Sequence, residues 1–229
     1  MKGKRIRLWD LPTRLFHWLL AAAVVAAVVT GQLGGNLIDW HGRIGLFVAG
    51  LLAFRVVWGI VGSTYARFAE FFPTPGKVRA YLAGQWRGEG HNPLGALSVF
   101  GLILLLTVQV ASGLFANDDI AFNGPLFHLV SKEVSNRLTS VHHLAANVLM
   151  VLVALHVAAI VFYGHPKKRN LVKPMITGWK DDAEGESATG GGWLALVVAL
   201  LIAGAAAYGA SGAWLPAPSA AAAVETPAW

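Results

Sequence analysis

The sequence predicts an all-α integral membrane protein, in which a four-helix transmembrane bundle is followed by a fifth, C-terminal transmembrane helix. The first observation is composition: 55% of the 229 residues are hydrophobic and 13% are charged, about half the charged share of an ordinary soluble domain. The second is pattern, because the apolar residues are gathered in blocks of about twenty, the length of helix that crosses a hydrocarbon core about 30 Å thick. The third is that many of the nine tryptophans lie near the ends of these blocks, where they suit interfacial anchoring.

Five apolar blocks are candidates for the membrane-spanning helices. The first could be mistaken for a secretory signal, since lysines and arginines precede an alanine-rich run. However, Asp10, Pro12 and Arg14 interrupt that pattern and no polar cleavage region follows, so we expect the segment to be retained. The predicted spans are 13–35, 40–61, 93–116, 138–163 and 193–215.

The basic residues of the connections predict the orientation. Fourteen lysines and arginines lie at the N-terminus or in the second and fourth connections, whereas the third connection contains only Lys132 and Arg137. Because cytoplasmic loops are enriched in positive residues, the N-terminus is expected inside and, after five spans, the C-terminus outside. The basic residues flank apolar blocks and form no single patch, so the net charge of +6 does not indicate a nucleic-acid partner.

The connections divide the chain into a main domain, residues 1–180, and a C-terminal part. Within the second connection, a short interfacial helix is expected to begin near Pro75, and Asn92 followed by a proline predicts the start of the third span. The acidic, glycine-rich stretch 181–192 is expected to be a flexible linker. The last span contains small residues and no ionisable group, as in a packing helix or anchor, and the tail 216–229 is expected to be disordered.

Four of the eight histidines are predicted to lie at two matching depths. His142 and His156 are fourteen residues apart in the fourth span, which returns them to within about 40° of one helix face and separates them by about 21 Å. The alternating direction of the spans then places His17 level with His156 on the inner side, and His41 level with His142 on the outer side. Any one of them alone is as well explained by an interfacial role, but ionisable groups inside a span are commonly functional.

Each level therefore offers two imidazoles on different helices, without a neighbouring carboxylate or thiolate. This donor set suits the two axial positions of a haem iron, whereas a tetrahedral zinc site needs about two further ligands. The sequence contains no cysteine, which excludes thiolate metal sites, iron–sulfur clusters and the covalent attachment of c-type haem.

Arginines and small residues near these levels are candidates for further cofactor contacts. Arg14, Arg43 and Arg55 could pair with haem propionates. Arg14 and Arg43 are explained equally well as interfacial residues, whereas Arg55 lies deeper and has a greater need for an anionic partner. Small residues such as Gly31 and Gly113 could give a macrocycle clearance between helices, although ordinary small-residue packing explains each of them as well.

Motifs in this order resemble the bacterial cytochrome b561 family, which is similar to the cytochrome b subunit of nickel-iron hydrogenases. They include "LWDLPTRLFHWLL", "WHGRIGLFVAGLLAFRVVWGIVGS", "SVHHLAANVLMVLVALHVAAIVFY" and "NLVKPMITG", and the resemblance covers about residues 5–180. It implies a four-helix core in the bacterial inner membrane that holds two non-covalent haems b and passes electrons between the quinone pool and a partner. The family's ligand set corresponds to His17 and His156 for the inner haem iron, and to His41 and His142 for the outer one.

Functions of different classes stay open at this point. One is a quinol-linked oxidoreductase that exchanges electrons with a periplasmic acceptor such as a c-type cytochrome. Another is a haem-bearing anchor subunit of a hydrogenase-like or other redox complex, which does no substrate chemistry itself. A histidine-lined metal transporter would contain no haem, and the fifth span could bind a partner or close a homodimer. Polar groups that could meet a quinone are His91, Asn92 and Arg87 inside, or Asp118, Asp119 and His128 outside.

Overall fold

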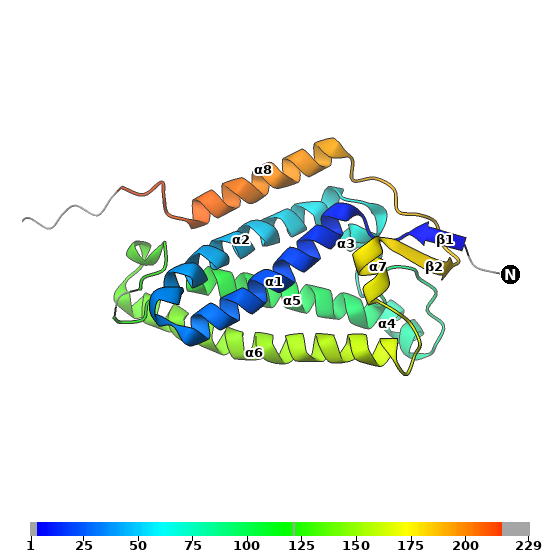
Figure 1. Ribbon diagram of the computed structural model, residues 1–229, viewed down its shortest axis with the longest axis horizontal. Helices are drawn as coiled ribbons and strands as arrows, with labels where there is room; N and C mark the ends of the chain where they lie inside the picture. Colours follow the sequence, from blue (N-terminus) through cyan, green and yellow to red (C-terminus); the bar gives the residue numbers. More distant parts are fainter. Residues whose placement is uncertain (1–3, 121, 217–229) are drawn as a thin grey trace, which may run out of the picture.

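The computed structural model describes residues 4–120 and 122–216, and its long helices run side by side (Figure 1). Within this part of the chain, five helices are long and apolar enough to cross a membrane, in agreement with the five predicted spans. They are α1 (Leu11–Leu33), α2 (Ile38–Val61), α5 (Pro93–Gly113), α6 (Lys132–Gly164) and α8 (Trp193–Ala210). The short elements are β1 (Lys4–Arg7), η1 (Gly35–Leu37), η2 (Thr64–Ala66), α3 (Phe68–Phe71), α4 (Pro75–Leu82), η3 (Phe127–Leu129), α7 (Val172–Thr177) and β2 (Trp179–Ala183).

Three helices begin where a capping side chain is followed by a proline in the first turn. The Asp10 carboxylate accepts a hydrogen bond of 2.7 Å from the Thr13 amide at the start of α1. The Asn92 side chain accepts one of 2.8 Å from the Gly95 amide at the start of α5, and Thr74 caps α4 in the same way. These caps satisfy amides that have no partner inside the helix. The predicted starts near Pro75 and at Asn92 are therefore confirmed.

The four helices of the main domain form a bundle that is closed on three sides. Close packing joins α1 to α2, α2 to α5, and α5 to α6, whereas α1 and α6 are not among the closely packed pairs. A buried apolar cluster fills the middle of the bundle with residues from all four helices: Ala23, Val48, Leu52, Leu106 and Leu149. The bundle thus has a seam between α1 and α6.

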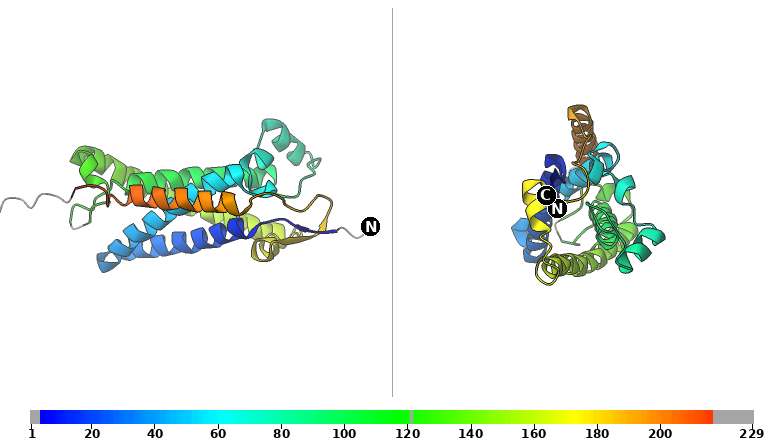
Figure 2. Two further views of the ribbon diagram at one scale, coloured as in Figure 1. Left: turned by 90° about the horizontal axis from the view of Figure 1, so that it is seen from above. Right: turned by 90° about the vertical axis from the view of Figure 1, so that its right-hand side faces the viewer.

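The fifth helix, α8, lies against the outside of α2, and the end-on view in Figure 2 shows it apart from the ring of the other helices. Its contact is made by small residues: a Cβ added at Gly50 of α2 would lie 3.3 Å from the Ala203 carbonyl oxygen, and Ala199 is fully buried. Small residues let two helix backbones approach closely in a membrane. The position of α8 leaves the seam between α1 and α6 uncovered.

The end of the bundle that carries the N-terminus is closed by a small cap. Strand β1 pairs antiparallel with β2, with Ile6 opposite Lys180. The following segment stays attached, since the Ala188 amide donates to the Arg7 carbonyl (2.7 Å) and the Thr64 amide donates to the Thr189 carbonyl (2.9 Å). The stretch 181–192, predicted to be a flexible linker, is therefore partly strand and partly bound to η2. Composition pointed to flexibility, but these backbone partners come from distant parts of the sequence.

Helix ends differ from the predicted spans by a few residues. The largest difference is at α6, which begins at Lys132 and not near residue 138, because Ser131 caps the helix and Glu133 pairs with Arg137 one turn later. These polar residues extend the helix beyond its apolar part. At the other end of the chain α8 stops at Ala210. The predicted disordered tail lies outside the described residues from position 217 onward.

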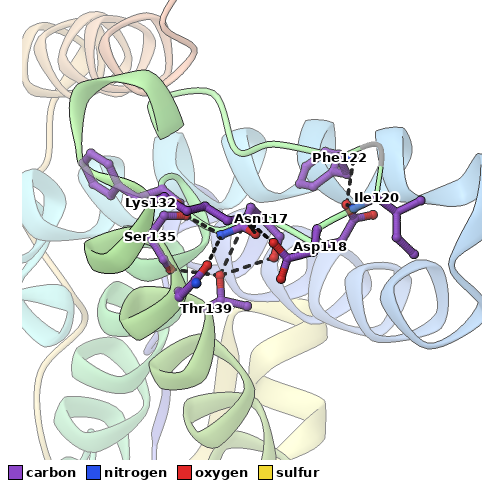
Figure 3. A network of polar contacts seen from close by, with 10 residues as sticks. Asn117, Asp118, Ile120, Phe122, Lys132, Ser135 and Thr139 are labelled. Carbon is purple, nitrogen blue, oxygen red and sulfur yellow. Dashed lines mark hydrogen bonds and ion pairs between the residues drawn. The ribbon is translucent and has the colours of Figure 1, made fainter.

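The loop between α5 and α6 is held by a network of polar contacts, shown in Figure 3. The Asn117 side chain donates hydrogen bonds to Ser135 Oγ (2.6 Å) and Asn136 Oδ1 (3.0 Å), and Lys132 contacts both Asn117 and Asp119. The Asp118 carboxylate accepts hydrogen bonds from the loop amides of residues 120 and 122, at 2.9 Å each. This network fastens the C-terminal end of α5 to the first turn of α6.

Candidate functional site

The structure brings four histidines together as two pairs. We call His17 and His156 the inner pair, at the end that carries the N-terminus, and His41 and His142 the outer pair. The ring centres are 6.5 Å apart in the inner pair and 5.9 Å apart in the outer pair. In both pairs one ring belongs to α6; its partner lies on α1 in the inner pair, across the seam, and on α2 in the outer pair. This geometry agrees with the predicted depths, while the role of the histidines as ligands stays a prediction.

Both separations suit one metal ion held between two imidazoles. Metal–imidazole nitrogen bonds are about 2 Å long, so two rings that bind one ion from opposite sides have centres about 6 Å apart. Among the described residues no group of three or more histidine, aspartate or glutamate side chains could hold a metal ion by itself. The arrangement therefore fits an ion whose other ligands come from a cofactor, as in haem.

In the outer pair, a backbone carbonyl orients each imidazole. His41 Nδ1 lies 2.8 Å from the Ala27 carbonyl oxygen of α1, and His142 Nδ1 lies 2.9 Å from the Gln109 carbonyl oxygen of α5. A carbonyl oxygen can only accept, so each Nδ1 must carry the proton. Each Nε2 is thereby left as the acceptor, the nitrogen that can bind a metal; in the structure as it stands, Nε2 of His142 accepts from the Gln109 amide.

A glycine lies four residues after each of these carbonyls and makes room for the ring. A Cβ at Gly31 would lie 2.9 Å from His41 Nδ1, and a Cβ at Gly113 would lie 2.8 Å from His142 Cε1. Both distances are shorter than a side chain tolerates. The sequence suggested these glycines as clearance for a macrocycle, but in the structure they admit the imidazoles to the neighbouring helix. By contrast, a Cβ added at Gly45, a glycine of α2, would have no atom of the described residues within 4 Å.

Gln109 is a site residue that the sequence analysis missed. Its side-chain Nε2 lies 3.0 Å from His142 Nε2, and its Oε1 is buried without a hydrogen-bond partner among the described residues. Since Nδ1 of His142 carries the proton, the amide of Gln109 donates to Nε2. The signal that could have identified it is a lone amide side chain in an otherwise apolar span, because such groups are costly in hydrocarbon.

The inner pair has a different environment. Within the described residues neither ring receives a carbonyl contact of this kind, and His17 Nδ1 is buried without a hydrogen-bond partner. Arg55 of α2 lies fourteen residues after His41, so it returns to the same helix face about 21 Å further along. It is only 3% exposed, its Nη1 has no hydrogen-bond partner among the residues that the structure describes, and its guanidinium lies 4.4 Å from the centre of the Phe68 ring.

The other two predicted arginines lie elsewhere. Arg14 Nη1 donates to the Ile176 carbonyl (2.5 Å), and Trp18 Nε1 donates to the Met175 carbonyl (3.1 Å), so both side chains attach α7 to the start of α1. Nε of Arg14 is buried and has no hydrogen-bond partner in the described part of the chain. Arg43 is exposed and lies over the Trp40 ring, 5.2 Å from its centre. Arg55 is thus the predicted arginine that the structure places deepest.

Beside the inner pair, a cavity of about 240 Å³ opens next to α4 and the loop that follows it. His91 lies in its wall with its ring between those of Trp9 and Phe71, whose centres are 4.7 and 4.5 Å away. Burial, followed by the charge of Arg55, lowers the pKa of His91 to about 3, so the ring is neutral at physiological pH. Other residues that line the cavity are Tyr65, Glu70, Lys77, Trp86, Arg87 and Glu89.

The structure separates the predicted quinone candidates. His91 and Arg87 share the cavity, whereas Asn92 caps α5 and donates to the Tyr163 hydroxyl (3.3 Å). On the other side, Asp118 and Asp119 belong to the loop network of Figure 3. His128 is exposed on η3.

Comparison with known proteins gives a consistent picture. The profile of the family described as "Prokaryotic cytochrome b561" matches residues 8–178. A protein of Azotobacter vinelandii named probable Ni/Fe-hydrogenase B-type cytochrome subunit is 28% identical and aligns with 79% of this chain and 92% of its own length. A protein of the same name from Cupriavidus necator is 26% identical, covering 78% and 89%.

A shorter match is the probable Ni/Fe-hydrogenase 1 B-type cytochrome subunit of Escherichia coli, 26% identical over 46% of this chain and 57% of that protein. No solved structure matches significantly. The family match spans α1, α2, α5 and α6, which include the three helices that carry the paired histidines, and stops before α8.

Proposed function

The chain belongs to the prokaryotic cytochrome b561 family, and from this membership we propose that it carries two haems b and links the quinone pool to a redox partner. Membership makes it a multi-pass bacterial membrane protein and a haem cytochrome b of electron transfer. The number of haems, their ligands, the quinone and the partner are the proposal. We take the N-terminus to be cytoplasmic and the C-terminus periplasmic, as the basic connections predict.

The observation that carries the proposal is the presence of two histidine pairs at the spacing of bis-imidazole coordination, 6.5 and 5.9 Å between ring centres. We assign one haem b to the inner pair and one to the outer pair. A haem with both axial positions filled exchanges single electrons and leaves no open position for oxygen. The chain's part is to hold the rings of each pair at this distance and to orient the outer rings through the Ala27 and Gln109 carbonyls. It also places Arg55 near His91, on the inner side, as a partner for a propionate.

Haem content tests the assignment. The purified wild-type protein should contain two haems per chain by pyridine haemochrome spectroscopy. His156→Ala should contain one haem, and so should His41→Ala, because the two pairs share no residue. His143→Ala is the matched control: it removes an exposed histidine next to His142 and should keep both haems. Two haems in either ligand variant would refute the pairing, and no haem in the wild type would refute the function.

For the quinone, the proposal uses the cavity that contains His91 and Arg87. A quinone headgroup needs an apolar wall and hydrogen-bond donors for its two carbonyl oxygens, and ligand pockets commonly combine these features. Phe71 and Trp86 supply aromatic surface, while Arg87 and Lys77 supply donors. His91 Nδ1 is buried without a partner among the described residues, and both histidines of the inner pair lie near His91.

The quinone proposal can be tested with the purified holoprotein and a soluble quinol analogue. Haem reduction should slow at least tenfold in Arg87→Gln and in His91→Phe, with an unchanged haem content. His128→Ala, at the opposite end of the bundle, should reduce at the wild-type rate. Slower reduction in the His128 variant alone would move the quinone to the other side.

A second candidate function is a haem-bearing anchor subunit that only connects a separate enzyme to the membrane. It is favoured by the names of the relatives, which describe subunits of Ni/Fe-hydrogenases. The same kinetic assay separates the two: reduction by the quinol analogue without any partner supports a quinone-reactive cytochrome. A chain with both haems that stays oxidised until a partner is added supports the anchor.

A further inference from the structure

The two histidine pairs differ in what surrounds the imidazoles, and we propose that this difference fixes the order of the two reduction potentials. In this proposal the outer site has the lower potential and the inner site the higher, so that electrons run from the outer site toward the His91 cavity. The inference rests on the proposed two-haem function. It adds a direction and assigns the tuning to the Ala27 and Gln109 carbonyls and to Arg55.

At the outer pair, both imidazoles are strong electron donors. His41 Nδ1–H donates to Ala27 at 2.8 Å, and His142 Nδ1–H donates to Gln109 at 2.9 Å. A hydrogen bond from the second ring nitrogen raises the basicity of a ligating histidine. A more basic axial ligand stabilises the oxidised iron more than the reduced iron, and therefore lowers the potential.

The approach of these rings to helix carbonyls depends on the same local sequence pattern on two helices. Ala27 is followed four residues later by Gly31 on α1, and Gln109 by Gly113 on α5. With any side chain in place of either glycine, a Cβ would stand less than 3.0 Å from ring atoms of His41 or His142. The pattern occurs at both outer ligands, and no described glycine would meet either inner ring in this way.

At the inner pair, the environment favours the reduced state. Among the described residues, His17 Nδ1 is buried without a hydrogen-bond partner, and no hydrogen bond orients His156. Arg55, fourteen residues after His41 on the same face of α2, is 3% exposed, and no described residue bonds its Nη1. A buried positive charge stabilises a centre that gains an electron, and this effect is strong where water is excluded.

Nearby acidic groups do not neutralise Arg55 by direct contact. No carboxylate of the described residues lies within 4.0 Å of its guanidinium. Asp10, whose charge Arg55 feels, is engaged by the Thr13 amide and by Trp58 Nε1 at 3.0 Å. If a propionate pairs with Arg55, that pairing also offsets the negative charge of the propionate near the iron.

Haems bound at the two pairs would supply single-electron exchange between the outer site, held by His41 and His142, and the inner site, held by His17 and His156. No proton or further reactant takes part in it. A donor reduces the outer site, and a two-electron, two-proton acceptor of the quinone class takes electrons from the inner site. The order of potentials therefore suits oxidation of a partner at the outer end and reduction of quinone at the inner end.

The order is measured by spectroelectrochemical titration of the purified holoprotein. His41→Ala and His156→Ala, which each keep one haem, assign the two midpoints. The haem left in His41→Ala is the inner one. We expect its midpoint potential to exceed that of the outer haem by at least about 59 mV, which corresponds to a tenfold preference for the electron in a one-electron couple. Equal midpoints, or a higher midpoint for the outer haem, would overturn the inference.

Two pairs of variants test the assigned causes. Gly113→Ala should weaken the His142 hydrogen bond and raise the outer midpoint, or release the outer haem, while leaving the inner midpoint in place. Gly101→Ala is its control, because a Cβ at Gly101 of the same helix meets nothing within 4 Å. Arg55→Met should lower the inner midpoint and Arg55→Lys should largely restore it. An unchanged inner midpoint in Arg55→Met with full haem content would show that Arg55 does not raise the potential of the inner haem.

The inference and the proposed function fail in different ways. A protein with fewer than two haems refutes the proposed function before any potential is measured. A protein with two haems whose midpoints are equal or reversed keeps the function and refutes only the inference. The absorption spectrum and the midpoints report on the ligands independently of turnover with any quinone.

Discussion

At the scale of single residues, Asp10 joins the start of α1 to α2 at the inner end. One carboxylate oxygen caps α1 through the Thr13 amide, and the other accepts the indole N–H of Trp58 from α2. Both Asp10 and Trp58 are buried. Loss of the carboxylate would therefore leave two buried donors without an acceptor, and such unsatisfied donors are costly.

We expect Asp10→Ala to lower the free energy of unfolding by about 1–3 kcal/mol, the cost of a lost cap and an unpaired buried donor. Asp10→Asn should lose less, since an amide oxygen still caps the helix. Denaturant unfolding of the holoprotein in detergent measures the change. Asp39→Ala, an exposed aspartate in the first turn of α2, is the control, and an equal loss there would contradict the special role of Asp10.

The residues themselves were predictable to different degrees. The paired histidines could be found from the sequence because an imidazole stands out in an apolar span and the fourteen-residue spacing repeats a helix face. The carbonyls of Ala27 and Gln109 could not be identified from the sequence, because every helical residue has a backbone carbonyl. Which carbonyl meets a histidine ring depends on how the neighbouring helix is placed. The use of Gly31 was hidden for the same reason.

At the scale of elements, Glu89 joins the loop before α5 to strand β2. It is 14% exposed and pairs with Lys180 at 2.5 Å. It also accepts hydrogen bonds from the Glu184 and Gly185 amides, at 2.7 and 2.8 Å. Burial alone would raise the pKa of Glu89, but the hydrogen bonds from Lys180 and the two amides outweigh it and lower the pKa.

Because the folded state holds the pKa of Glu89 below its unfolded value, this carboxylate stabilises the cap at pH values above the ordinary glutamate range, near 4.3. That contribution is lost as the pH falls through the lowered pKa. We expect Glu89→Ala to cost about 1.5–3 kcal/mol at neutral pH and to speed amide exchange in residues 179–190. The pH dependence of the wild type and the variant should converge in acid.

The control for this prediction is Glu133→Ala, which removes an exposed ion pair with Arg137 at the other end of the bundle. Exposed pairs contribute little, so this variant should unfold like the wild type. Unchanged exchange in residues 179–190 of Glu89→Ala would show that β1 alone fixes the strand.

The helices could be predicted from local sequence patterns, whereas the small cap formed by β1, β2 and the segment after them could not. Apolar length predicted the five spans, and side-chain caps with prolines predicted two of the helix starts, those of α4 and α5. The early start of α6 was missed because polar residues continue a helix past the membrane. The order in 181–192 was missed because Gly191, with a φ of 64°, allows the chain to pass close to Ser63, and composition does not reveal that contact.

At the scale of the whole molecule, the paired levels and the membrane orientation are separate matters. The pairs depend only on the alternation of helix direction, which Figure 1 shows for α1, α2, α5 and α6. Which end faces the cytoplasm depends on the distribution of positive charge. The direction of electron flow relative to the membrane therefore follows only when the orientation is known.

The absence of cysteine from the sequence makes orientation measurable with single cysteines. Ile120→Cys places one on the outer loop, where the side chain is 91% exposed, and Glu186→Cys places one on the inner cap, where it is 89% exposed. A membrane-impermeant maleimide applied to spheroplasts should label the first and spare the second until the membrane is opened. The reverse pattern would place the N-terminus outside. It would leave both histidine pairs intact but turn the proposed electron path, and the His91 cavity with it, to the periplasmic side.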